Sequence, residues 1–257
     1  MLLTIDIGNT TIALGAFEGE RLAFVRRLPS DRDMDAGACA RRLLEQLALE
    51  NAGPQDLEGA VLCSVVPALT AVVNRAVEQL TGRTPLVVAR PEDAGLRIGN
   101  YDQSNLGMDR VVDCAAALAR WKPPLAVFDM GTATTLSVLD EAGVFQGGMI
   151  LPGLRLSVDA LSARAAQLPP ISFEPPAGLI GTDTVSCMQY GALYGAAATV
   201  EGIAARLEEQ LGSALTVVLT GGLGRHILPL LRRPVEYEPQ LQLLGLRTIY
   251  LHAQNKQ

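Results

Sequence analysis

Two stretches of the chain carry the same pattern of apolar and polar positions. Each is a short apolar run, a polar turn and a second apolar run, and the turns read Asp6-Ile7-Gly8-Asn9-Thr10-Thr11 and Asp129-Met130-Gly131-Thr132-Ala133-Thr134-Thr135. The second copy begins 123 positions after the first in a chain of 257 residues. A strand, a tight polar turn and another strand form a hairpin signature, so we predict a duplicated domain with one such hairpin in each half.

The rest of the chain alternates between helical and extended apolar patterns, which indicates the α/β class. The consecutive prolines in Lys122-Pro123-Pro124 end a helix. They predict that one lobe comprises residues 1–121 and the other comprises residues 122–257. We expect strands over 60–66, 85–89 and 216–219, a strand and turn over 147–153, and helices over about 35–49, 68–80, 109–121, 154–167, 184–211 and from 240 onward.

Composition and charge agree with a soluble enzyme. Hydrophobic residues make up 49% of the chain and charged residues 19%, which provides ample material for a core. The net charge of −6 argues against nucleic acid as a partner. No apolar stretch is long enough to span a membrane, and the first residues lack the basic region of a signal peptide, so we expect a cytoplasmic location.

The cysteines and histidines indicate neither a disulfide framework nor a zinc site. The histidines, His226 and His252, lie far apart in the sequence, which counts against a histidine-based zinc site. The cysteines are scattered without a Cys-x-x-Cys pair, so we expect reduced and mostly buried thiols at Cys39, Cys63, Cys114 and Cys187.

The two repeated turns have the chemistry of a phosphate site. Glycine lets the backbone approach a ligand closely, and neighbouring Asn and Thr add donors, so such a turn can hold phosphate oxygens. An Asp at the end of each strand can hold a hydrated Mg²⁺ or another cation. The alternative is a plain hairpin turn in which the Asp caps backbone amides. The repetition favours phosphate, with a nucleotide held between the two lobes.

Three further segments carry candidate chemistry, and each has a structural alternative. Asp109 lies at the start of a predicted helix, where it is either an N-cap or a general base, with Arg110 beside it for an anionic group. Residues 181–184 (Gly-Thr-Asp-Thr) either cap the next helix or offer a hydroxyl to a substrate. Thr220-Gly221-Gly222 follows a buried strand, and it is either an ordinary turn or a flat surface for adenine or ribose.

Together these segments resemble the type III pantothenate kinases of the actin-like ATPase (ASKHA) superfamily, over essentially the full length. The two Asp-containing turns look like that family's two phosphate motifs. Gly107-Met108-Asp109-Arg110 matches its Gly-x-Asp-Arg element, residues 147–153 match its Gly-Gly-x-Ile-x-Pro-Gly element, and Thr220-Gly221-Gly222 matches its adenosine-side turn. The resemblance implies an α/β fold of duplicated actin-like (ribonuclease H-like) lobes, each a mixed sheet flanked by helices. It also implies a homodimer with pantothenate bound near the subunit interface.

The implied reaction is transfer of the γ-phosphoryl group of ATP to pantothenate, which gives 4′-phosphopantothenate, the first step of coenzyme A biosynthesis. Phosphoryl transfer depends mainly on positioning and charge neutralisation. By the resemblance, Asp109 is the general base, and pantothenate contacts Tyr101, Gly107, Met108, Arg110 and Thr184. ATP contacts Asp6, Ile7, Gly8, Asn9, Thr10, Thr11, Gly131, Thr132, Gly221 and Gly222.

The resemblance also implies metal ions, namely Mg²⁺ positioned by Asp6 through water and a monovalent cation, K⁺ or NH₄⁺, bound by Asp129. Neither phosphate turn contains a Lys or Arg. Metal ions and backbone dipoles must therefore supply the positive field that ATP requires.

The sequence departs from the family pattern before Gly107. Residues 101–106 (Tyr-Asp-Gln-Ser-Asn-Leu) lack the proline of the family's Tyr-x-Asn-Pro element, and the segment is one residue shorter. Three other functions remain as alternatives: a sugar kinase of the same superfamily, a phosphate-ester hydrolase, and a nucleotide-binding regulator without catalysis. The apolar stripe of the 184–211 helix could form a subunit interface, although such a stripe is more often core; its members are Met188, Leu193, Ala197, Val200, Ile203 and Leu207.

Overall fold

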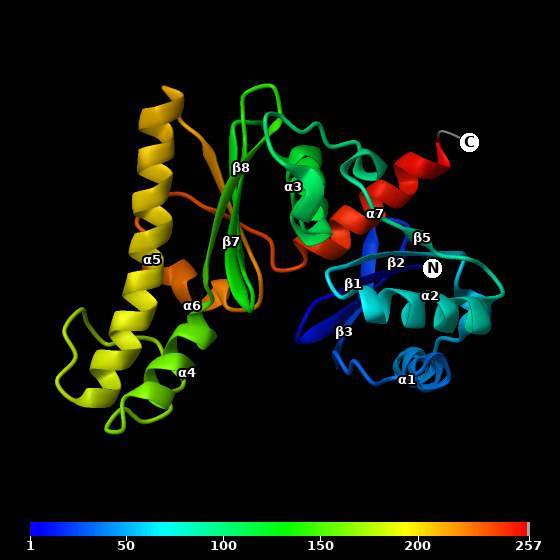
Figure 1. The fold of residues 1–257 in the computed structure, drawn as a ribbon, viewed down its shortest axis with the longest axis horizontal. Helices are drawn as coiled ribbons and strands as arrows, with labels where there is room; N and C mark the ends of the chain where they lie inside the picture. The colour runs from blue at the N-terminus through cyan, green and yellow to red at the C-terminus, as the bar shows by residue number, and fades with distance from the viewer. Residues whose placement is uncertain (256–257) are drawn as a thin grey trace. The chain divides into compact units, whose positions relative to one another are not determined.

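The computed structural model describes residues 1–255 and contains two five-stranded sheets flanked by helices (Figure 1). The strand order is β3-β2-β1-β4-β5 in one sheet and β10-β9-β6-β7-β8 in the other. Contacts divide the chain into two compact units. Unit 1 comprises Met1–Arg97, Asp102–Ala119 and the chain from Gln242, and unit 2 comprises Ile98–Tyr101 and Arg120–Leu241.

Unit 1 is built around the first sheet. Its strands are β1 (Leu2–Ile7), β2 (Thr11–Glu18), β3 (Arg21–Pro29), β4 (Gly59–Ser64) and β5 (Leu86–Val87). Its helices are α1 (Ala36–Ala48), α2 (Pro67–Thr81), α3 (Met108–Arg120) and α7 (Leu241–Gln254), with 3₁₀ turns at Pro54–Asp56, Pro91–Ala94 and Gln103–Asn105.

Unit 2 is built around the second sheet. Its strands are β6 (Leu125–Met130), β7 (Ala133–Leu139), β8 (Phe145–Pro152), β9 (Thr216–Thr220) and β10 (Glu236–Tyr237). Its helices are α4 (Leu154–Arg164), α5 (Thr184–Leu211) and α6 (Gly224–Ile227), followed by a 3₁₀ turn at Leu228–Leu230.

The duplication predicted from the sequence is confirmed by the topology. In each sheet the first strand pairs antiparallel with the second and parallel with the fourth, so β1, β2 and β4 correspond to β6, β7 and β9. Each copy also has a register irregularity between its second and third strands. The α/β class with two mixed sheets is therefore correct.

The alternation of side chains along β1 determines what each face of the first sheet contacts. Leu3, Ile5 and Ile7 are buried in a core with side chains from α1 and α2. On the opposite face, Thr4 is fully buried, and its hydroxyl donates to the Gly15 carbonyl at 3.0 Å. A β-carbon added to Gly15 would lie 3.0 Å from Leu243 Cδ1, so α7 packs closely on that face.

The long helix α5 supplies much of the core of unit 2. Met188, Leu193, Ala197, Val200 and Ala204 are buried at helical spacing, and they pack with β6, β7, β9 and α4. Ile203 and Leu207 pack against the same core. The apolar stripe seen in the sequence is therefore largely core within the chain.

Some segments differ from the sequence-based expectations. Residues 21–29, for which no strand is predicted, form β3 at the edge of the sheet, where charged side chains such as those of Arg26 and Arg27 are common. The region 90–108 contains two 3₁₀ turns, and α4 ends at Arg164 rather than Gln167. In the middle of the chain unit 1 ends at Ala119 and unit 2 resumes at Arg120, and the chain from Gln242, which carries most of α7, belongs to unit 1.

The packing of α7 on α3 allows a test of the fold. A β-carbon at Gly245 would lie 2.5 Å from the Val112 carbonyl oxygen, 2.8 Å from Val112 Cγ1 and 3.1 Å from Ala116 Cβ. We predict that Gly245→Ala lowers the free energy of unfolding by about 1–3 kcal/mol, because overpacking outweighs the gain in helix propensity. Urea denaturation measures this change.

Gly202→Ala on α5 is the matched control, because its β-carbon would meet only the end of the Arg206 side chain, with Nη1 at 3.3 Å. The control should leave stability unchanged or raise it by about 1 kcal/mol. A Gly245→Ala variant as stable as the control would contradict the packing described here.

Candidate active site

The first repeated turn, between β1 and β2, presents polar groups above a buried strand end. Ile7 is fully buried, whereas Asn9 and Thr10 are exposed and Gly8 and Thr11 are half-buried. The amide of Gly8 donates to the Thr11 carbonyl at 3.0 Å, which closes the turn. This fixed loop of exposed donors and acceptors suits an anionic ligand.

Asp6 lies at the end of β1, opposite Cys63 on the parallel strand β4. The Cys63 thiol donates to Asp6 Oδ1 at 3.3 Å. This carboxyl group is thus contacted from the neighbouring strand, whereas the Gly8 amide of the turn donates to Thr11.

Burial is the main reason that the pKa of Asp6 rises to about 7. The negative charge of Asp109 raises this pKa further, whereas the Cys63 hydrogen bond and the charge of Arg27 lower it. Asp6 and Asp109 therefore belong to one electrostatic site within unit 1.

Asp109 lies in the first turn of α3, because the helix begins at Met108. Asp109 is therefore the second residue of the helix, whereas the N-cap alternative would place it just before the helix. Asp109 Oδ1 accepts from the Arg110 amide at 2.8 Å. Burial raises the pKa of Asp109, and the Arg110 amide and guanidinium partly offset this rise.

Three neighbouring residues define the environment of the Asp109 carboxyl group. A β-carbon on Gly107 would overlap Asp109 Oδ1, so glycine is needed for this side-chain placement. Arg110 is 6% exposed and Met108 is half-buried. A desolvated carboxylate beside a buried guanidinium is suited to proton transfer and to binding an anion.

The second repeated turn, between β6 and β7, is one residue shorter than the first. The Gly131 amide donates to the Ala133 carbonyl at 3.1 Å, and Thr132 is exposed. Asp129 pairs with Thr220 across the parallel strands β6 and β9, so the turn after β9 begins beside it. Gly221 has a φ of 85°, and a β-carbon there would lie 2.5 Å from Asp129 Oδ1.

That position therefore requires glycine both for its backbone angle and for the space it leaves. The following Gly222 is exposed, with open space where a β-carbon would be. Unit 2 thus brings together Asp129, the Gly131 turn and the Gly221-Gly222 turn at the ends of neighbouring strands, where α/β proteins commonly bind ligands.

Tyr101 and Thr184 lie apart from these turns along unit 2. The Tyr101 ring contacts Phe145 edge-on, with ring centroids 5.2 Å apart. Thr184 is the exposed first residue of α5, and Asp183 before it caps the helix by accepting from the Val185 and Ser186 amides at 2.9 and 3.0 Å. The capping alternative for this segment is correct for Asp183, and the substrate role of Thr184 stays a prediction.

The carboxylates fit metal ions that take most of their ligands from water and phosphate. Among residues 1–255 no three His, Cys, Asp or Glu side chains form a group that could hold a metal ion by themselves. Asp6 and Asp129 are instead single carboxylates, which is how proteins usually hold Mg²⁺ at a phosphate site. None of the four cysteines forms a disulfide; Cys39, Cys63 and Cys114 are buried and Cys187 is exposed.

Sequence reasoning missed two contacts at the first turn, those of Cys63 with Asp6 and of Arg32 with Asn9. Cys63 lies 57 residues from Asp6 and Arg32 lies 23 residues from Asn9. Both contacts depend on strand pairing and on the course of a loop, and no motif in the sequence marks either residue.

Within residues 1–255, every helix is too short or too polar to span a membrane.

A family model and curated relatives of this chain agree on one family. The family model for type III pantothenate kinase matches residues 2–206. Type III pantothenate kinases from Moorella thermoacetica and Agathobacter rectalis are 39% and 34% identical, over 97% and 100% of this chain and 98% and 99% of their own lengths.

Solved structures support the fold alone. A Baf family protein from Campylobacter jejuni is 20% identical with a TM-score of 0.59, covering 98% of this chain and 99% of that one. A protein from Sinorhizobium meliloti described as a 2-dehydro-3-deoxygalactonokinase is 17% identical with a TM-score of 0.55 and the same coverage.

Proposed function

The chain belongs to the family of type III pantothenate kinases, and we propose that Asp109 acts as the general base in its reaction. That reaction is the ATP-dependent phosphorylation of pantothenate to 4′-phosphopantothenate in coenzyme A biosynthesis. The family match over the full length of curated relatives favours this function over the sugar kinase and hydrolase alternatives.

The observation that carries the proposal is the environment of the Asp109 carboxyl group. Its Oδ1 accepts from the Arg110 amide at 2.8 Å, and the carboxyl group has further lone pairs that can accept the proton of a substrate hydroxyl. Burial raises the pKa of Asp109, and a carboxylate with a raised pKa is a stronger base. When the pantothenate hydroxyl attacks the γ-phosphorus, its proton passes to the Asp109 carboxylate and ADP leaves.

The residues around Asp109 serve to bind the acceptor. The buried Arg110 guanidinium is a planar donor that suits the pantothenate carboxylate, with Gly107 and Met108 beside it. Tyr101 and Thr184 contribute a phenol and a hydroxyl by the family resemblance. Arg110 and its neighbours in unit 1 would fix the acceptor so that its hydroxyl is presented to Asp109, and positioning of this kind supplies much of the acceleration in phosphoryl transfer.

ATP is held by the two turns and by ions. In unit 1 the contacts are Asp6, Ile7, Gly8, Asn9, Thr10 and Thr11, and in unit 2 they are Gly131, Thr132, Gly221 and Gly222. Asp6 would hold Mg²⁺ through water, and Asp129 would bind K⁺ or NH₄⁺. When bound, these ions neutralise charge on the transferring phosphoryl group.

We also propose a homodimer in the cytoplasm. Apolar side chains are exposed on β8, α4 and the segment before α5, with Ile150 70%, Leu161 47% and Ile180 82% exposed. A groove of about 510 Å³ between α4 and α5 is lined by Leu161, Thr184, Cys187 and Met188, so a second copy seated there would adjoin Thr184. The four cysteines form no disulfide, which suits a reducing compartment.

The role of Asp109 is tested by Asp109→Asn. We predict that kcat falls about 100-fold or more while ATP affinity changes little, because the amide cannot accept the proton. The native enzyme should also lose activity as the pH falls, since the base works only when it is ionised. Steady-state kinetics with thermal unfolding as a folding check measure both effects.

Asp159→Asn is the matched control, because this exposed α4 residue has only a 3.9 Å contact with Arg155. The control should keep native rates. Near-native turnover in a folded Asp109→Asn variant would show that another group takes the proton.

The cation role of Asp129 is tested by Asp129→Ala. Native activity should be higher in potassium or ammonium than in sodium, and the variant should lose this difference because its carboxylate ligand is gone. Glu141→Ala, an exposed acid in the same unit, should keep it. A variant that still distinguishes potassium from sodium would exclude Asp129 as the ligand.

The dimer is tested by Leu161→Glu, which places a charge in the groove. Sedimentation velocity should show a native dimer and a largely monomeric variant, because burying an unpaired carboxylate is costly. Leu49→Glu, at an apolar residue of α1's C-terminus that is 66% exposed in unit 1, should remain a dimer. A native monomer at micromolar concentration, or a dimeric Leu161→Glu, would refute this interface.

A further inference from the structure

The segment after β3 is hydrogen-bonded onto the first phosphate turn. The Ser30 amide donates to the Thr10 carbonyl at 3.0 Å, and the Ser30 hydroxyl donates to the Gly8 carbonyl at 2.6 Å. Arg32 Nη2 donates to Asn9 Oδ1 at 3.2 Å. Three successive turn residues therefore each accept a hydrogen bond from this one segment.

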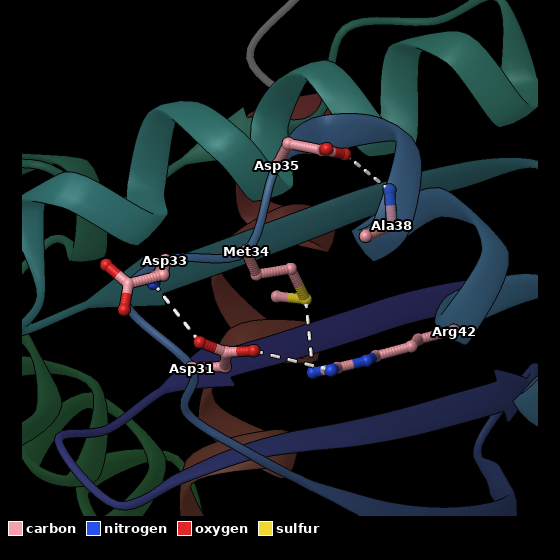
Figure 2. Close-up of polar contacts among 6 residues, drawn as sticks. All are labelled: Asp31, Asp33, Met34, Asp35, Ala38 and Arg42. Atoms are coloured by element: carbon pink, nitrogen blue, oxygen red, sulfur yellow. Dashed lines mark hydrogen bonds and ion pairs between the residues drawn. The ribbon is translucent and has the colours of Figure 1, made fainter.

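A second set of contacts holds the residues on either side of Arg32, and Figure 2 shows these contacts. Asp31 Oδ1 accepts from the Asp33 amide at 3.1 Å, and Asp31 Oδ2 pairs with Arg42 Nη2 at 3.4 Å. Arg42 Nη1 contacts Met34 Sδ at 3.4 Å, and Met34 is buried in the core of unit 1. Asp35 then caps α1 by accepting from the Ala38 amide at 2.7 Å.

These contacts distinguish two arginines of the same segment. Arg42 is used to hold Asp31 and Met34, so its role is structural. Arg32 is exposed, and in the part of the chain that the structure describes it pairs with no carboxylate. Its guanidinium has five N–H donors, of which the contact with Asn9 uses one.

The first turn lacks positively charged side chains, and Arg32 lies beside it. Residues 6–11 include no Lys or Arg and carry the negative charge of Asp6, although they are proposed to hold a polyanion. A guanidinium that already contacts Asn9 lies at the edge of this turn and offers the planar donor set that suits phosphate oxygens. Its anchored backbone lowers the entropy lost when the ligand binds.

We propose that Arg32 binds the phosphates of ATP at the first turn and supplies the positive charge that the turn itself lacks. The inference rests on the proposed function of residues 6–11 as an ATP site. Arg32 lies outside both repeated motifs, and the loop from Ser30 to Asp35 serves as the support that presents it.

Binding of MgATP and of adenosine, measured by titration calorimetry without pantothenate, tests this proposal. Arg32→Gln, which keeps an N–H donor for Asn9 but removes the charge, should weaken MgATP binding about tenfold. Arg32→Lys should stay within about threefold of the native affinity, because an ammonium still binds phosphate as a point charge. Adenosine binding should be the same in every variant. Arg41→Gln, at an exposed arginine on α1, should match the native chain.

Raising the salt concentration should weaken MgATP binding to the native chain more than to Arg32→Gln. Equal MgATP affinities in the native chain and Arg32→Gln would overturn the proposal. An Arg32→Lys variant as weak as Arg32→Gln would also overturn it, because restoring the positive charge would then restore no affinity. Failure of the proposed kinase reaction is a separate result, seen as a native chain that binds MgATP with Arg32-dependent affinity but forms no ADP with pantothenate.

Discussion

The register of the central strands is the constraint on which the rest of the structure depends. In β1 the neighbours of Asp6 are Ile5 and Ile7, both fully buried against α1 and α2. A slip of one residue would move these apolar side chains to the other face and force the carboxyl group into the core. Burial of the apolar set thus fixes Asp6 on the opposite face, at the carboxyl end of the strand.

The same constraint acts in the second sheet. Phe128 and Met130 are buried in the core of unit 2, so Asp129 between them points away from that core. The parallel partner strands β4 and β9 then place Cys63 beside Asp6 and Thr220 beside Asp129. One duplicated arrangement of packing therefore yields the two acidic turns that are proposed to bind nucleotide and metal.

Much of this could be predicted from the sequence because it depends on local patterns. The hairpins, the start of α3 before Asp109 and the full length of α5 follow from periodicity, turn residues and caps. The contact of Arg32 with Asn9 and the return of α7 to unit 1 could not be predicted, because each depends on which distant segments come together, and one sequence without pairing information does not specify that choice. The strand β3 was also missed, although it pairs with its neighbour β2 across a short turn between Glu18 and Arg21.

The most direct test of the account is ADP formation from ATP and Mg²⁺, measured with and without pantothenate, first in potassium and then in sodium buffer. The account predicts ADP release that requires pantothenate and is faster in potassium. ATP binding without any pantothenate-dependent ADP release would contradict it, and would indicate a different acceptor or a nucleotide-binding regulator.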